Sequence, residues 1–283
     1  MGRLDVPRFG VRRFCGAMLA VMIGAADPAG ATETDPFRSV MWDDMRALVL
    51  GDAPFRFDDR VKVTAPASAE DALNVPVAVD ATALGAVERI AVFADMNPIP
   101  RILDYRPIAA RPTIALRLKL QQATAIRAAA LTPDGVWHVG GVFVDAAGGG
   151  CTSPALAHGD PTWERHLGEV QARAWPAVQA SAEGQSKSTR LRLRVRHPMD
   201  TGLAPGIPAF FIETLVVRDG DGRELARIDS HEPVSENPVF TVEVTPPADG
   251  RALLVTGRDN NGTEIRASVP LAWRQSSLET STR

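Results

Sequence analysis

RLRLRVR, residues 190–196, is the stretch of sequence that decides the fold class. Its three apolar residues alternate strictly with four arginines, and this period of two is typical of a β-strand with one buried and one exposed face. The same alternation returns in FTVEV, residues 240–244. We therefore expect the second half of the chain to consist of half-buried strands in sheets.

Turn sequences predict hairpins in both halves of the chain. Pro133-Asp134-Gly135, Asp219-Gly220-Asp221-Gly222 and Asn261-Gly262 each stand between two short apolar runs, and these residue types supply the backbone angles that tight turns need. The flanking strands are expected at residues 124–131 and 136–144, 215–217 and 224–228, and 253–256 and 263–267. Further strands are expected at residues 75–79, 89–93 and 115–120; in the last of these, leucines alternate with Arg117 and Lys119.

These elements predict an all-β fold with two immunoglobulin-like β-sandwich domains, at residues 60–151 and 189–274. A connector at residues 152–188 is expected to join the two domains. It contains a short helix that begins at Asp160-Pro161 and a polar linker at residues 181–188.

The segments before and after the two expected domains have different patterns. An N-terminal helical segment is expected within residues 32–59, with Asp35 as N-cap and Pro36 in the first turn. The apolar residues at helical spacing in this segment are Phe37, Met41, Met45 and Leu48. At the other end, residues 275–283 are expected to form a disordered tail.

Composition excludes several classes of protein. The chain has 283 residues, of which 45% are hydrophobic and 23% are charged, so a disordered or low-complexity protein is excluded. The formal net charge of −3 leaves no basic excess for a nucleic-acid backbone or an anionic membrane surface. We therefore expect no nucleic-acid partner.

Residues 1–31 have the pattern of an export signal. Arginines between positions 3 and 13 precede an apolar stretch from Phe14 to Ala26, and small residues follow up to Ala31. The apolar stretch is too short to span a bilayer core of roughly 30 Å, so no membrane span is expected in the mature chain. We expect a signal peptide cleaved near Ala31 and a periplasmic protein, and the sequence leaves open whether the general or the twin-arginine export route is used.

Cys151 is expected to be the reactive residue. The chain has two cysteines, and Cys15 would leave with the signal, so the exported protein would hold a single thiol. Cys151 follows Gly148, Gly149 and Gly150, which predicts a flexible arm that holds the sulfur on the order of 10 Å clear of the sandwich. No lysine or arginine adjoins the cysteine in sequence, so we expect the pKa of the thiol near the reference value of about 8.5. Such a thiol suits the covalent attachment of a group that other enzymes load and unload.

Five short motifs point to a family. The first half contains ADMNPIP at residues 94–100 and ends in GGGC at residues 148–151. The second half contains RHPMDTG at residues 196–202, IPAFFI at residues 207–212 and VSENPV at residues 234–239. In kind and order, the first two motifs resemble the SoxY subunit of the sulfur-oxidation carrier SoxYZ, and the other three resemble its SoxZ subunit. The resemblance extends over most of the mature chain, which looks like SoxY fused to SoxZ.

The resemblance implies a function for the glycine arm. In that family the cysteine at the end of the arm holds a sulfur intermediate covalently, as a thiosulfonate-type adduct, while periplasmic sulfur-oxidation enzymes and c-type cytochromes process it. By this match Cys151 would be the attachment residue and Gly148, Gly149 and Gly150 its arm. The protein would then be a carrier without catalysis, cofactor or metal of its own.

One difference separates this sequence from SoxY. Thr152-Ser153-Pro154 follows the cysteine at the point where a SoxY chain ends, so the arm is tethered on both sides. The fused arrangement resembles the SoxYZ-like carriers associated with quinoprotein alcohol dehydrogenases, and such a dehydrogenase is the other partner that the resemblance implies.

Two other hypotheses stay open at the level of sequence. The chain could be an accessory protein that docks a periplasmic quinoprotein dehydrogenase and carries no covalent cargo. It could also bind copper through Cys151 and His158, because copper prefers thiolate and imidazole ligands. A contact between His197-Pro198-Met199 and the glycine arm is a further hypothesis about the second half.

Overall fold

The computed structural model describes residues 1–2, 34–181, 184–245 and 252–271. Residues 3–31 of the expected export signal and the expected tail at residues 275–283 therefore lie outside the described residues. Residues Thr34–Arg283 form one compact unit. Within the described ranges, no helix is long and apolar enough to cross a membrane.

The first half of the chain is rich in strands, as its alternating runs predict. Its strands are β1 (Phe55–Phe57), β2 (Lys62–Thr64), β3 (Ser68–Ala69), β4 (Val75–Asp80), β5 (Arg89–Ala94), β6 (Arg101–Arg106), β7 (Ala110–Leu118), β8 (Thr124–Leu131) and β9 (Trp137–Ala146). A 3₁₀ turn, η1 (Thr82–Leu84), follows β4. In the turn between β8 and β9, Gly135 has a φ of 81°, the left-handed angle for which glycine is suited.

The second half contains the remaining strands. They are β10 (Val170–Ser181), β11 (Gly184–Val195), β12 (Asp200–Thr201), β13 (Ala209–Phe210), β14 (Ile212–Arg218), β15 (Glu224–Ser230), β16 (Val239–Val244), β17 (Ala252–Asp259) and β18 (Glu264–Pro270). Two 3₁₀ turns, η2 (Leu156–Gly159) and η3 (Trp163–His166), lie in the expected connector. Strand β11 begins inside the stretch expected to be a linker, because the main-chain hydrogen bonds of a hairpin require no apolar side chains.

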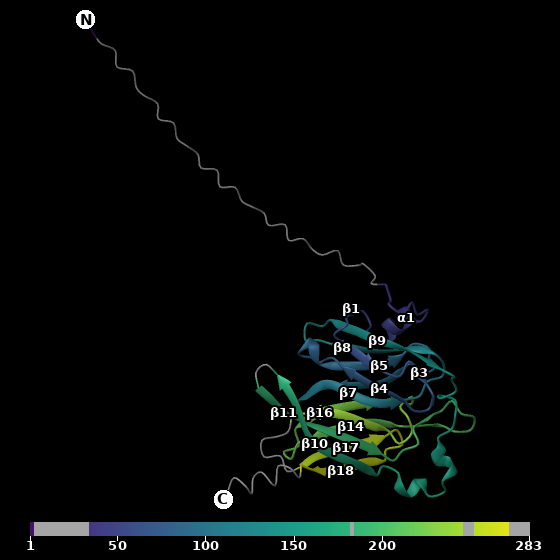
Figure 1. Ribbon diagram of the computed structural model, residues 1–283. Helices are drawn as coiled ribbons and strands as arrows, with labels where there is room; N and C mark the ends of the chain where they lie inside the picture. Colours follow the sequence, from purple (N-terminus) through teal and green to yellow (C-terminus); the bar gives the residue numbers. More distant parts are fainter. Residues whose placement is uncertain (3–33, 182–183, 246–251, 272–283) are drawn as a thin grey trace, which may run out of the picture. The chain divides into compact units, whose positions relative to one another are not determined.

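Two sheets contain most of the described strands. One has the order β1-β9-β8-β5-β6-β15-β14-β17-β18, with β3 paired to β9, and the other has the order β10-β11-β16-β7-β4-β2. Both sheets run through both halves of the chain, because β6 pairs with β15 and β7 pairs with β16. Figure 1 shows β7 beside β16. The all-β class is confirmed. The two halves share continuous sheets, which the sequence did not predict.

The main core lies between the two sheets. Leu191, Leu193 and Val195 are fully buried in it, whereas Arg192 and Arg194 are exposed, as the alternation of residues 190–196 predicts. Burial of an aliphatic side chain contributes about 1.5–3 kcal/mol, so these three contribute on the order of 6 kcal/mol before the cost of ordering the chain.

A second, smaller core covers the other face of the larger sheet. The helix α1 (Trp42–Val49) packs Trp42, Met45 and Val49 there against the β5 residue Phe93 and the β9 residue Trp137 (Figure 1). Because both faces are covered at this point, residues 124–130 of β8 are all buried.

The helix begins later than the sequence predicts. Asp35 lies seven residues before it, and the carboxylate of Asp35 accepts hydrogen bonds from the backbone N–H groups of Phe37 at 3.3 Å and Ser39 at 2.7 Å. Asp35 therefore closes a turn before the helix instead of capping it. The buried face consequently includes Trp42 and Val49, and Leu48, which was expected in the apolar stripe, is exposed.

Candidate functional site

The glycine arm leaves the larger sheet at the end of β9 and bends back toward it. Gly148 and Gly149 have φ values of 98° and 84°, a left-handed conformation that side chains with a Cβ rarely adopt. At Gly150 a Cβ would lie 2.3 Å from the carbonyl oxygen of Ala72. Gly148 and Gly150 therefore allow close packing against neighbouring carbonyl oxygens, whereas Gly149 is favoured by its backbone angle alone.

The segment that follows β7 holds the arm in place. The N–H of Gly149 donates to the carbonyl of Gln121 at 3.1 Å, and the N–H of Gly150 donates to the carbonyl of Leu120 at 3.0 Å. The N–H of Cys151 donates to the side-chain oxygen of Gln121 at 3.2 Å. The arm thus runs along residues 120–121 and does not extend into solvent.

The Cys151 thiol is buried, which corrects the expectation of an exposed sulfur. Its residue is 0% exposed, and the Sγ atom lies 3.8 Å from the carbonyl oxygen of Lys119. Burial raises the pKa of the thiol to about 11, and the nearby Lys119 ammonium offsets this only in part. The expectation of a pKa near 8.5 is therefore wrong for this conformation, because residues 120–121 offer carbonyl acceptors that draw the glycine N–H groups inward.

Lys119, which was expected on the exposed face of a strand, is buried, and its charge acts on the Cys151 thiol. β7 ends at Leu118, so the chain turns and Lys119 points inward instead of continuing the alternation with Arg117. Its Nζ donates to the carbonyl of Met199. Burial lowers the pKa of the ammonium, while the charges of Asp200, Cys151 and Glu236 act in the opposite direction.

The second half of the chain closes the site from the other side. The Thr201 hydroxyl of β12 donates to the carbonyl of Cys151. Asp200 accepts a hydrogen bond from the Ala155 N–H at 3.4 Å and lies 2.9 Å from the His158 Nε2. Thr201 therefore contacts the arm, and the hypothesis of a contact through His197-Pro198-Met199 stays a prediction.

His197 shapes the loop that carries Met199 and Thr201. Its Nδ1 accepts the N–H of Met199 at 3.0 Å, and Met199 has a φ of 53°. The Nε2 lies 3.5 Å from the Asp259 Oδ2, and neither atom has a hydrogen-bond partner. Burial lowers the pKa of His197 to about 4 despite the nearby carboxylate of Asp259.

The ADMNPIP motif holds the segment to which the arm binds. Asn97 donates through Nδ2 to the carbonyl of Lys119 at 2.9 Å and accepts the N–H of Gln121 through Oδ1 at 2.9 Å. One side chain thus fixes both ends of the segment to which the arm binds. Asn97 is 6% exposed, so water competes little for these bonds.

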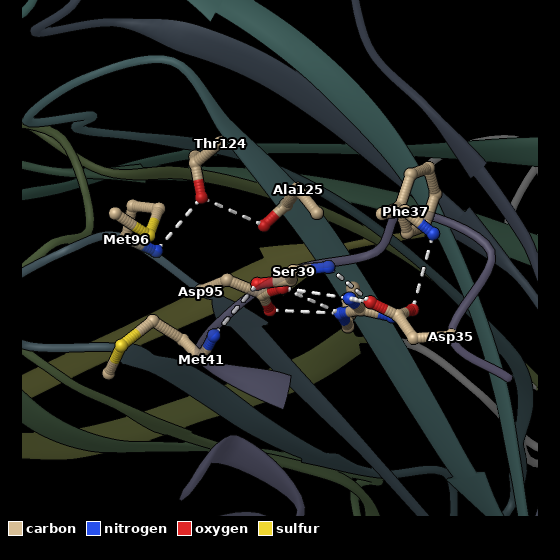
Figure 2. A network of polar contacts seen from close by, with 9 residues as sticks. Asp35, Phe37, Ser39, Met41, Asp95, Met96, Thr124 and Ala125 are labelled. Carbon is tan, nitrogen blue, oxygen red and sulfur yellow. Dashed lines mark hydrogen bonds and ion pairs between the residues drawn. The ribbon is translucent and has the colours of Figure 1, made fainter. Parts of the chain in front are cut away.

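Asp95 in the same motif belongs to a buried ionic network (Figure 2). Arg127 of β8 is 0% exposed and donates to the carboxylates of Asp95 and Asp35, at 2.8 Å and 2.7 Å respectively. Its guanidinium carbon also lies 4.5 Å from the centre of the Trp42 ring. The network joins the N-terminal segment to the sheet that presents the arm.

The structure does not assemble a metal site from Cys151 and His158. The His158 ring is hydrogen-bonded to Asp200, and Cys151 is buried beside Lys119. Across residues 34–181, 184–245 and 252–271, no three His, Cys, Asp or Glu side chains lie together as metal ligands.

Sequence reasoning missed the residues that hold the arm. Lys119, Gln121 and Thr201 come from two halves of the chain, and only the fold brings them to Cys151. Lys119 continues the alternation of leucines with basic residues in LRLKL, residues 116–120, so no local signal in the sequence indicates that its side chain is buried.

Comparison with known families matches both halves of the chain. The family described as "Sulfur oxidation protein SoxY" matches residues 46–151, and the family described as "Sulphur oxidation protein SoxZ" matches residues 178–270. The first match ends at Cys151 itself. No curated protein matches the sequence.

Two solved structures are similar to parts of the chain. The sulfur carrier protein SoxY from Chlorobium limicola f thiosulfatophilum has 21% sequence identity and a TM-score of 0.34, covering 37% of this chain and 90% of that chain. A protein of Corynebacterium diphtheriae has 8% identity and a TM-score of 0.23, covering 75% of this chain and 57% of that chain.

Proposed function

The chain joins a SoxY domain to a SoxZ domain and so belongs to the sulfur-oxidation carriers. We propose that Cys151 carries a sulfur-containing intermediate covalently. SoxY and SoxZ are carrier or accessory proteins of sulfur oxidation. The observation that carries the proposal is the position of Cys151, which ends the SoxY domain on three glycines and is contacted by Thr201 of the SoxZ domain.

The attachment chemistry needs an electron acceptor. With thiosulfate as the sulfur donor, the Cys151 thiol and the outer sulfur of thiosulfate form an S–S bond, releasing one proton and two electrons. The product is a cysteine S-thiosulfonate, and a partner c-type cytochrome system takes the two electrons. The protein itself contributes the thiol and its presentation, and it turns over nothing.

Loading requires the arm to open. The thiolate is the nucleophile in such chemistry, and in the closed arrangement burial keeps the pKa of Cys151 at about 11. A closed arm therefore protects the thiol at neutral pH. Opening needs the loss of the bonds to residues 120–121 and to Thr201, and it would return the thiol to water and to an ordinary pKa.

The proposed place of action is the periplasm. Sox proteins are typically periplasmic, and residues 1–31 have the sequence pattern of an export signal that is cleaved near Ala31. The partners proposed for this site are periplasmic sulfur-oxidation enzymes and c-type cytochromes. The fused arrangement also makes a quinoprotein dehydrogenase a candidate partner.

Mass spectrometry of the intact protein tests the covalent proposal. Protein is purified from its native periplasm without reductant, beside a Cys151→Ser variant. We expect an added mass on the wild-type chain that dithiothreitol removes and that the variant lacks. An unmodified wild-type mass, or an added mass that persists in the variant, would contradict the proposal.

A second candidate function is an accessory protein that docks a periplasmic quinoprotein dehydrogenase without covalent cargo. The burial of Cys151 favours it, because a thiol that is 0% exposed is not available to a partner in this conformation. It predicts that Cys151→Ser retains both partner binding and alcohol-dependent respiration. Loss of respiration with binding intact would reject it in favour of the carrier.

A further inference from the structure

The outer face of the smaller sheet carries three arginines without partners. Arg117 lies on β7, and Arg192 and Arg194 lie on β11; all three are exposed. Within the described ranges, none of these guanidinium groups has a hydrogen bond or ion pair. Arg190 on the same face differs, because it pairs with Glu243 at 2.5 Å.

The register of the strands places two of these arginines on either side of Val239, and Arg192 lies opposite the next outward residue, Thr241. Val239 of β16 pairs with Arg194 on one side. On the other side Thr241 pairs with Ala115, which places Arg117 opposite Val239 two residues further along. Neighbouring strands lie about 4.8 Å apart, so the Cα atoms of Arg117 and Arg194 are roughly 10 Å apart across Val239. Two arginine side chains can meet over that distance.

A groove lies at this point. It has a volume of about 340 Å³, and its lining includes Arg117, Arg192, Arg194 and Val239 together with Lys119. This volume is at the lower end of the range for small-molecule sites. Lys119 connects the groove to the arm, because its carbonyl is also the neighbour of the Cys151 sulfur.

Two carboxylates also line the groove, and each is hydrogen-bonded to a neutral group. Glu236 accepts the Leu156 N–H at 2.6 Å and the Asn237 Nδ2–H at 3.0 Å. Asp71 accepts the Leu73 N–H at 2.9 Å. Neither carboxylate forms an ion pair with a guanidinium group, and the three arginines with Lys119 outnumber the two carboxylates, so the lining keeps an excess of positive charge.

We propose that this groove is a binding site for a small tetrahedral oxyanion with two negative charges, for which sulfate and thiosulfate serve as probes. Guanidinium groups bind such oxyanions through paired, charge-assisted hydrogen bonds, and three of them line this groove. The inference goes beyond the carrier function. It rests on the arginines and the groove, and it holds whether or not Cys151 receives cargo.

Calorimetric titration tests the site. Sodium sulfate and sodium thiosulfate are titrated into the full mature chain at low ionic strength, where screening is small, with sodium chloride as the monoanion control. We expect saturable binding of both dianions. Arg194→Gln should weaken it by about tenfold or more, since one charge-assisted contact is lost. Arg56→Gln, which removes the same charge from an exposed position on β1, should leave it unchanged.

Two further experiments locate the bound anion. Cys151→Ser should bind sulfate as wild type does, and a crystal soaked in sodium selenate should show anomalous selenium density between Arg117 and Arg194. Equal weakening by Arg194→Gln and Arg56→Gln, or binding that requires Cys151, would overturn the inference. Binding of poly-L-glutamate but not of sulfate would also overturn it and would identify a protein-docking face instead.

Discussion

Replacement of Thr201 by valine should make the buried thiol more reactive. The Thr201 hydroxyl donates to the carbonyl of Cys151, and valine keeps the shape of the side chain while removing the donor. The substitution therefore destabilises the closed arm, in which the Cys151 carbonyl loses its hydrogen-bond donor, and not the open arm, in which water can bond to that carbonyl. We therefore expect the variant to shift the arm toward its open state and to increase the rate at which Cys151 is alkylated.

The size of the effect follows from the contacts that hold the arm. Four of the hydrogen bonds that hold it join its backbone to the rest of the fold, through the N–H groups of Gly149, Gly150 and Cys151 and through the Thr201 hydroxyl. At about 0.5–1.5 kcal/mol each, opening costs about 2–6 kcal/mol. Loss of one bond, about 1 kcal/mol, should raise the open population and the alkylation rate about fivefold.

The assay is alkylation by iodoacetamide at neutral pH, followed by intact mass. Denatured protein gives the rate of the fully exposed thiol. Thr214→Val is the matched control: the Thr214 hydroxyl donates to the Asp229 carboxylate at 2.9 Å, so the same substitution removes a hydrogen bond far along the chain from the arm. We expect this control to alkylate at the wild-type rate.

Two results would refute the reasoning. One is a wild-type thiol that reacts as fast as the thiol of the denatured protein, because the closed arm should protect it. The other is an equal acceleration by Thr201→Val and Thr214→Val, because the effect would then come from global destabilisation.

Three other predictions concern stability. Arg127→Met should lower the free energy of unfolding in urea by about 3–5 kcal/mol, since Asp35 and Asp95 would stay buried without a cation. Arg60→Met removes an exposed ion pair and should leave the free energy of unfolding nearly unchanged. Gly150→Ala should lower the melting temperature, because the new Cβ would meet a carbonyl oxygen at 2.3 Å; an unchanged value would contradict the packing of the arm. The pKa of His197 is about 4 in the folded protein, below its ordinary 6.5, so the unfolded chain binds a proton more readily between these values. The contribution of His197 to stability is therefore present above pH 6.5 and is lost as the pH falls through 4. Urea unfolding across this range should show a loss of up to about 3 kcal/mol that His197→Gln lacks.

The strands were predictable because their information is local. Residues 190–196 alternate with period two, and the structure buries Leu191, Leu193 and Val195 as that alternation requires. The turn at Gly135 was equally visible, since its left-handed angle calls for glycine. Local pattern does not report which strands meet across the molecule, so the pairing of β6 with β15 could not be inferred.

The position of Cys151 was predicted, but not its surroundings. Three glycines signal that the backbone can adopt unusual angles, and this freedom serves close packing as well as projection into solvent. Which of the two occurs depends on acceptors elsewhere in the chain, at Leu120 and Gln121. For the same reason the high pKa of the thiol could not be predicted from its sequence neighbours.

The shared sheets make the pairing of the two domains independent of concentration. In a carrier made from two separate chains, a site with groups from both would be lost on dilution as the chains dissociate. Here β7 and β16 are hydrogen-bonded within one polypeptide, so the contact between Thr201 and Cys151 persists in a single molecule. Each thiol keeps its own SoxZ half for the lifetime of the protein, and exchange of that half between carriers is ruled out by covalent connection.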